Sequence, residues 1–257
     1  MDNWLKELAC PICHRKLSQL KEQVLSCKHC KVEYPVKDNI AYLIPPGTLN
    51  DSSYSLEINR YNKIARKGAD VYDGLQDTFP IRRAELVREI LKDRNIKKFV
   101  NVGVGFGDLE KKTTDFEVFS VDPCNEFLKI VKNQNPKIHC INAIAEALPF
   151  PENSIGCLVS ESTFQSINNR LKFLYEIGRI TKPGSLIVIN IGYKWHYPRK
   201  PQDGFNINIP IERKTLELFL AELGFEVEYK YHNIKRGEWK SKKEDADYLW
   251  IIGKKKE

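Results

Sequence analysis

The sequence lacks long apolar runs, and none approaches the roughly 18 consecutive apolar residues that a membrane-spanning helix needs. Its first residues, MDNWLKE, lack the apolar core and small-residue cleavage site of a secretion signal. Internal repeats and low-complexity segments are absent as well. We therefore expect a cytoplasmic protein with no membrane partner.

Two phosphate-binding signatures are also missing. No Gly-Lys-Ser/Thr sequence is present, so a phosphate loop of the nucleotide-hydrolase type is not expected. The glycine-rich segment 99–108 (FVNVGVGFGD) contains Gly103, Gly105 and Gly107, but the third glycine of a dinucleotide fingerprint is replaced by Asp108. An acidic group there would repel a pyrophosphate at a helix amino terminus. Cofactors that carry phosphate groups are therefore disfavoured.

The composition is that of an ordinary globular protein. The 257 residues are 42% hydrophobic and 29% charged, enough for one large domain and a small module. The formal charge of +7 lies partly in short lysine runs at 240–243 and 254–256. Such runs are usually solvated faces or tails, and a nucleic-acid footprint needs a contiguous patch. Charge therefore leaves the substrate class open.

Four of the seven cysteines form two knuckles near the amino terminus, Cys10-Pro-Ile-Cys13 and Cys27-Lys-His-Cys30. Paired Cys-x-x-Cys motifs suit tetrahedral zinc, because each short loop turns two thiolates toward one ion. His14 and His29 lie beside these ligands and could substitute for one of them. Four cysteines already complete a closed shell, so we expect structural Zn2+ rather than a catalytic metal.

The first 45 or so residues resemble a known module. The two knuckles, followed by residues 34–45 (YPVKDNIAYLIP), are similar to the zinc ribbon of the small activator subunits of tRNA and protein methyltransferases. In that family the module is a separate partner or is fused ahead of a methyltransferase. The resemblance implies that a methyltransferase domain follows.

The rest of the chain alternates between predicted strands and helices. A breaker-rich stretch at 45–53 marks a boundary, so we expect a zinc-ribbon module at 1–46, a linker with lid helices at 47–95 and a third domain at 96–257. The predicted helices are 56–67, 81–92 and 212–223, and the predicted strands are 98–102, 117–121, 137–141, 156–160, 185–191, 225–231 and 248–252. This order predicts an α/β, Rossmann-like, doubly wound and mostly parallel seven-stranded sheet with an antiparallel C-terminal strand.

An acidic residue follows the second of the third domain's strands. Asp122 ends that strand, where a carboxylate can accept hydrogen bonds from both hydroxyls of a ribose. Together with the glycine turn, it suits a nucleoside without phosphates.

Residues 60–252 resemble the class I S-adenosylmethionine-dependent methyltransferases of the small-molecule, type 11-like branch. The first motif is matched by 102–107 (VGVGFG), the second by 120–122 (SVD), the third by 146–154 (EALPFPENS) and the following helix and strand by 176–189. The resemblance implies S-adenosylmethionine as cofactor, with these binding residues: Asn101, Gly103, Gly105, Gly107, Asp122, Ala145, Glu146 and Ser160. It places the methionine moiety at the glycines, the ribose at Asp122 and the adenine beside Ala145 and Glu146.

Two positions depart from the family pattern. The family usually has Asp in the places of Asn101 and Ile144. Asn retains a polar carbonyl, whereas Ile cannot accept a hydrogen bond from the adenine amino group. Each loss costs on the order of 1 kcal/mol of binding.

Three functions remain open. The first is methylation of a small molecule or carrier-linked metabolite, the second is methylation of RNA with the ribbon as a docking module, and the third is a non-catalytic binding or scaffold role. No Pro-Pro-Tyr element for base amines follows the fourth strand. No catalytic residue is assigned, although His196 could act as a base and Tyr61, Tyr72 and Asp73 could belong to a lid.

Overall fold

The amino-terminal part of the chain is built mainly from short strands. The computed structural model describes residues 3–68, 79–192, 213–233, 236–240, 246 and 248–257. The first elements are η1 (Asn3–Glu7), β1 (Ser18–Lys21), β2 (Val24–Cys27), β3 (Val32–Lys37), β4 (Ile40–Tyr42) and η2 (Thr48–Asn50). Strands β1 to β4 pair in sequence, each antiparallel to the next.

The remaining helices and strands follow along the chain. They are α1 (Ser52–Lys67), α2 (Phe79–Asp93), β5 (Lys98–Val102), α3 (Asp108–Lys112), β6 (Glu117–Val121), α4 (Asn125–Gln134), β7 (His139–Asn142), β8 (Ile155–Glu161), η4 (Phe164–Ser166), α5 (Arg170–Ile180), β9 (Thr181–Gly192), α6 (Arg213–Glu222), β10 (Phe225–Asn233), β11 (Glu238–Lys240) and β12 (Tyr248–Lys255). The cap of α1 is Asp51, whose carboxylate accepts from the backbone N–H of Ser53 at 2.8 Å. In the described residues, no helix is both long and apolar enough to cross a bilayer.

One sheet runs through the whole molecule in the order β1-β2-β3-β4-β7-β6-β5-β8-β9-β12-β10-β11. Its central strands, from β4 to β9, pair in parallel. Strand β12 is antiparallel to both of its neighbours, β9 and β10. The predicted fold class is therefore confirmed, with the seven expected strands running from β7 to β10.

The structure extends that sheet at both ends. At one end β4 pairs in parallel with β7, so the ribbon continues the sheet. At the other end β11, a three-residue strand not predicted from the sequence, pairs with β10 and becomes the edge. Its segment EWK is too short and polar to give a strand pattern.

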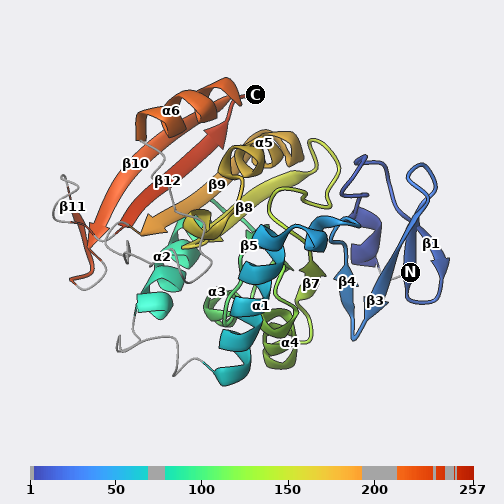
Figure 1. Ribbon diagram of the computed structural model, residues 1–257. Helices are drawn as coiled ribbons and strands as arrows, with labels where there is room; N and C mark the ends of the chain where they lie inside the picture. The colour runs from blue at the N-terminus through green and yellow to red at the C-terminus, as the bar shows by residue number, and fades with distance from the viewer. Residues whose placement is uncertain (1–2, 69–78, 193–212, 234–235, 241–245, 247) are drawn as a thin grey trace.

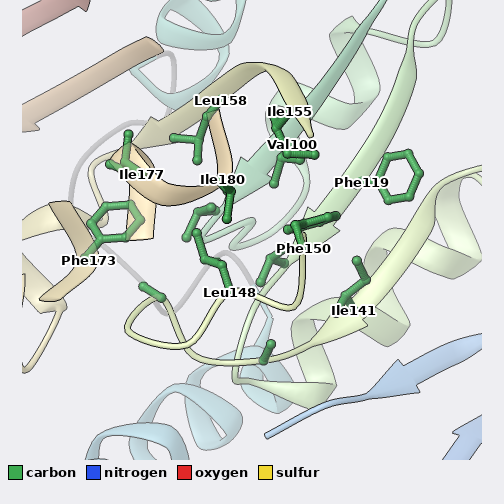
Figure 2. Packing of buried hydrophobic residues seen from close by; sticks show 14 of the residues in the cluster. Val100, Phe119, Ile141, Leu148, Phe150, Ile155, Leu158, Phe173, Ile177 and Ile180 are labelled. Atoms are coloured by element: carbon green, nitrogen blue, oxygen red, sulfur yellow. The ribbon is translucent and has the colours of Figure 1, made fainter. Parts of the chain in front are cut away.

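Helices cover both faces of the sheet. Figure 1 shows α5 and α6 on one side and α1 to α4 on the other, and the two buried hydrophobic clusters follow the same division. Figure 2 shows side chains of β5 to β8 gathered with those of α5 and of Leu148 and Phe150 in the first cluster. Strands buried on both faces read as continuous apolar runs, which explains why β5 and β6 have the predicted bounds.

The ribbon packs against the rest of the chain through several contacts. Trp4 stacks on His139 of β7 at 5.1 Å between ring centroids and meets Phe119 edge-on at 6.4 Å. The backbone N–H of Ala9 donates to the carbonyl of Pro149 at 2.9 Å. Trp4 also belongs to the same hydrophobic cluster as β5 to β8. The boundary predicted at residue 46 therefore separates segments that share a sheet and a core.

Candidate functional site

A cavity of about 250 Å³ lies at the carboxyl ends of the central parallel strands. Its walls come from the loops after β5, β6, β7 and β8 and from helices α1 and α2. In open parallel sheets, ligands bind outside the carboxyl ends of the strands, at the strand where the order reverses. That strand is β5, which has β6 on one side and β8 on the other.

Most of the predicted cofactor-binding residues meet at this cavity. Those that line it are Asn101, Gly103, Gly105, Asp122, Ala145 and Glu146. Gly107 and Ser160 are not among the lining residues. The Ser160 hydroxyl instead donates to the carbonyl of Val102 at 3.0 Å, across the β5–β8 pair.

Glycine is present at the three positions of the turn for different structural reasons. Gly103 has φ +83°, and a Cβ there would lie 2.0 Å from Oγ1 of Thr163, so a side chain is sterically excluded. Gly105 has φ +52° beside open space, which leaves its backbone accessible to a ligand. At Gly107, with φ +77°, a Cβ would lie 2.8 Å from Val131. Gly107 thus permits close packing on α4 rather than approach to the cavity.

Asp122 connects the loops at the end of β6. Its Oδ2 accepts from the backbone N–H of Val104 at 2.9 Å, and its Oδ1 accepts from that of Cys124 at 2.7 Å. Burial raises the pKa of Asp122 to about 7, against the lowering effect of these hydrogen bonds. Each carboxylate oxygen has a second lone pair, so both can still accept from a pair of hydroxyls.

A buried polar network lies behind the glycine turn. Asn101 Nδ2 donates to Glu110 Oε1 at 2.8 Å, and Ser120 Oγ donates to the same oxygen at 2.6 Å. Asn101 Oδ1 and Glu110 Oε2 are buried without a hydrogen-bond partner among the described residues. An ionised carboxylate can only accept hydrogen bonds, so Glu110 contacts the NH2 group of the Asn101 amide and leaves the amide carbonyl oxygen unengaged. Burial raises the pKa of Glu110.

The loop after β7 forms another wall of the cavity. Ile144, Ala145 and Glu146 all line it and are all buried. Glu146 Oε1 accepts from the backbone N–H of Asn169 at 3.0 Å, and burial raises the pKa of its carboxyl group. Ile144 contributes only apolar surface, so its side chain offers no hydrogen-bond acceptor to the cavity.

Acidic groups outnumber basic ones around the cavity. The described lining residues include the carboxyl groups of Glu57, Asp108, Asp122, Glu146 and Glu161, and a single basic side chain, Arg83. Such an arrangement favours a cationic ligand and disfavours a phosphate. This agrees with the expectation drawn from the glycine turn.

Some functional candidates could not be anticipated. Arg83 and Glu110 carry no local sequence signal, because charged residues on amphipathic helices are usually solvent-facing. Tyr61 lines the cavity and its hydroxyl lies 2.9 Å from Ser166 Oγ, joining α1 to the loop after β8. Tyr72, Asp73 and His196 lie outside the described residues.

The four amino-terminal cysteines converge on one point. The Sγ atoms of Cys10, Cys13, Cys27 and Cys30 all lie within 4.8 Å of one another. The Cys10–Cys30 sulfur distance is 3.9 Å and the Cys13–Cys27 distance is 3.5 Å. Zinc–sulfur bonds of about 2.3 Å in a tetrahedron separate the sulfurs by about 3.8 Å. The cluster therefore fits a zinc ion with a closed ligand shell.

Comparison with known families identifies two segments. Residues 5–39 match the family described as Trm112p-like protein, and residues 100–189 match the family described as methyltransferase domain. The first match contains the cysteine cluster, and the second contains most of the loops that line the cavity.

Curated relatives match part of the chain at low identity. A demethylmenaquinone methyltransferase from Renibacterium salmoninarum is 30% identical over 95 residues, which are 36% of this chain and 40% of the relative. The ubiquinone/menaquinone biosynthesis C-methyltransferase UbiE from Vibrio cholerae is 24% identical over 178 residues, covering 55% of this chain and 68% of the relative. The matched part of the chain thus spans 40% and 68% of the length of these two relatives.

A solved structure shows the same fold. One chain of a complex that contains the Haloferax volcanii Trm112 methyltransferase activator superposes with a TM-score of 0.59 at 15% identity, covering 78% of this chain and 96% of that one. The protein joins a Trm112p-like segment to a class I methyltransferase domain in a single chain.

Proposed function

We propose that this protein is an S-adenosylmethionine-dependent methyltransferase whose acceptor is a small molecule. The observation that carries the proposal is the cavity beside β5, where five carboxyl groups and one guanidinium group are found among the described lining residues. S-adenosylmethionine combines a nucleoside with a sulfonium cation, an ammonium cation and one carboxylate, so it has a net positive charge, and it carries no phosphate. When bound, it supplies an electrophilic methyl group.

The residues present fit this cofactor. In the proposal, Asp122 accepts from the ribose hydroxyls, and the free Asn101 Oδ1 accepts from the ammonium group. Gly103 and Gly105 allow the backbone to approach the methionine moiety. Ala145 and Glu146 border the adenine.

The small-molecule acceptor is supported by the named activities of the relatives. Their names refer to demethylmenaquinone and to ubiquinone/menaquinone biosynthesis, and quinones contain a planar ring. The cavity is apolar on several sides, with Phe106 and Phe127 meeting edge-on at 5.0 Å. Such a surface suits a planar ring.

We further propose that the Trm112p-like segment acts within the chain as a structural support. Its strand β4 completes the sheet beside β7, and the cysteine cluster would hold zinc to stabilise the knuckles. In this proposal, the predicted segments 1–46, 47–95 and 96–257 differ in sequence pattern but do not fold independently of one another.

Affinity for the positively charged cofactor should increase with pH, because the cavity carboxyl groups ionise. Burial raises the pKa values of Asp122 and Glu161 to about 7, so part of the cavity's negative charge is neutralised below this pH. A cationic ligand favours the ionised carboxylates and releases protons on binding, so S-adenosylmethionine affinity should rise about three- to tenfold from pH 6 to pH 8. Calorimetric titration in buffers of different ionisation enthalpy measures both affinity and protons released.

S-adenosylhomocysteine is the matched control for this experiment, because it lacks only the sulfonium methyl group and its charge. Its affinity should change less over the same pH range. An affinity ratio that stays constant would contradict the electrostatic argument. Absence of binding by both ligands up to millimolar concentration would contradict the proposed function and favour a scaffold.

The Asn101–Glu110 contact gives a second test. Replacing Glu110 by Leu removes the acceptor that orients the Asn101 amide, so affinity for S-adenosylhomocysteine should fall about tenfold, as expected for one lost hydrogen bond. Glu110→Gln retains an acceptor oxygen and should bind nearly as the unmodified protein does. Affinity for 5′-methylthioadenosine, which lacks the amino-acid moiety, should not change in either variant. An equal loss for both ligands would indicate a general structural effect instead.

A further inference from the structure

A charged pair lies in the cavity at the carboxyl end of β8. Arg83 Nε is 3.6 Å from Glu161 Oε2, and their side chains are only 14% and 12% exposed. Arg83 is held from its other side by Tyr248, whose hydroxyl accepts from Nη1 at 2.7 Å and whose ring centroid is 5.1 Å from the guanidinium carbon. The pair is therefore a fixed feature of the cavity wall rather than a surface ion pair.

Arg83 retains an unused hydrogen-bond donor. Its Nε is buried and has no hydrogen-bond partner among the described residues, since 3.6 Å from Glu161 is too long for a hydrogen bond. Buried donors are almost always satisfied, so an unsatisfied one beside a cavity points to a ligand atom that accepts from it. Arg83 and Glu161 both line the cavity.

Glu161 is positioned by the neighbouring strand. Asn190 of β9 is its partner in the parallel register, and Asn190 Oδ1 accepts from the backbone N–H of Ser162 at 2.9 Å. This contact fixes the Asn190 amide, whose Nδ2 is buried without a hydrogen-bond partner among the described residues. The neighbouring Asn190 side chain lowers the pKa of Glu161, against the larger effect of burial. Asn190 is fully buried, so it acts through Glu161 as a positioning residue.

The pair adjoins the turn proposed to hold the methionine moiety. Thr163 Oγ1 donates to the carbonyl of Glu161 at 2.9 Å and lies 3.3 Å from that of Gly103. The carboxyl end of β8 and the glycine turn are therefore in direct contact. An acceptor held by Glu161 and Arg83 would share the cavity with the reactive end of the cofactor.

We propose that Glu161 and Arg83 form the methyl-acceptor subsite and that the acceptor is an acidic hydroxyl compound, a phenol or an enol. This inference rests on the proposed methyltransferase function. A hydroxyl that loses its proton needs one proton acceptor and one donor for the resulting oxyanion, which are the two groups present. An ammonium acceptor would be repelled by Arg83, and a phosphate by the surrounding carboxylates.

The proton and electron balance is simple. The acceptor's hydroxyl proton passes to a Glu161 oxygen, and the oxyanion accepts from Arg83 Nε. An electron pair of that oxygen would form the bond to the methyl carbon as the carbon–sulfur bond breaks and its pair stays on sulfur. Burial raises the pKa of Glu161 to about 7, opposed mainly by Arg83, while Asp108 and Glu110 of α3 raise it further. A base of this strength suits proton transfer near neutral pH.

The first experiment uses 4-nitrophenol, whose phenolate is coloured, with the full-length protein saturated with S-adenosylhomocysteine. The bound probe should absorb as the phenolate at a pH where the free probe is largely neutral. Arg83→Met should weaken phenolate binding at least tenfold. Arg88→Met is the matched control on the same helix, because Arg88 pairs with exposed Asp115 outside the cavity. Arg83→Lys retains the positive charge but lacks the planar guanidinium group with its fixed N–H donors, so its affinity for the phenolate should be intermediate.

The second experiment tests Glu161 by its titration. A bound oxyanion requires Glu161 to carry the proton, so phenolate affinity should fall as pH rises through about 7 in the unmodified protein. Glu161→Gln should remove this pH dependence. Phenolate binding that is indifferent to both Arg83→Met and Glu161→Gln, or tighter binding of benzylamine than of 4-nitrophenol, would overturn the subsite. Failure of the unmodified protein to bind S-adenosylhomocysteine would instead overturn the proposed function.

Discussion

Asp122→Ala should reduce S-adenosylmethionine affinity by at least about 100-fold. The substitution removes both oxygens that are proposed to accept from the ribose, and hydrogen bonds to a charged acceptor contribute about 1.5–3 kcal/mol each. It also leaves the backbone N–H groups of Val104 and Cys124 without their acceptors, which loosens the glycine turn. Calorimetric titration well below the melting temperature of the variant measures the effect.

A buried carboxyl group outside the cavity provides the matched control. Glu176 also accepts a backbone N–H, that of Leu148 at 2.8 Å, and it pairs with Arg179 at 2.7 Å. Glu176→Gln should lower stability without changing cofactor affinity, whereas Asp122→Asn should weaken binding because only one acceptor oxygen remains. If Asp122→Ala bound S-adenosylmethionine within threefold of the unmodified protein, the assignment of Asp122 would be wrong.

Loss of the cysteine cluster should destabilise the whole chain. Cys27→Ser removes one of four converging thiolates, and structural zinc sites supply folding free energy directly. Because the ribbon shares a core with β5 to β8, the single unfolding transition should shift down by at least about 10 °C, corresponding to a few kcal/mol. Differential scanning calorimetry with metal analysis checks this.

Cys157→Ala is the control, since Cys157 is a buried cysteine of β8 outside the cluster. It should cause only the modest loss expected of a small core substitution and leave the metal content unchanged. Two separate transitions, with the upper one unaffected by Cys27→Ser, would show that the ribbon folds independently of the methyltransferase domain.

Much of the fold follows from local sequence patterns. The apolar runs 98–102 and 117–121 are strands buried on both faces, so their bounds can be predicted from the sequence without tertiary information. The glycine turn and the cysteine knuckles can also be predicted from the sequence. The turn requires glycine because of its backbone conformation, and a metal site requires cysteines at this spacing.

Other features depend on contacts between distant segments. Arg83 faces Glu161 and Tyr248 only because α2 packs against the ends of β8 and β12, and nothing near Arg83 in the sequence indicates this. The pairing of Asn101 with Glu110 likewise requires the sharp turn between β5 and α3. The pairing of β4 with β7 joins residues about one hundred positions apart. Hydrophobic periodicity and strand propensity do not indicate which strands pair over such a distance.

The β4–β7 pairing also bears on stoichiometry. A strand edge that is already paired cannot recruit a further strand, so no separate activator protein can add to β7 at this position. Because the supporting strand belongs to the same polypeptide, its effective concentration does not depend on expression level or dilution. Each methyltransferase domain is therefore joined to its own supporting strand at a fixed ratio of one to one.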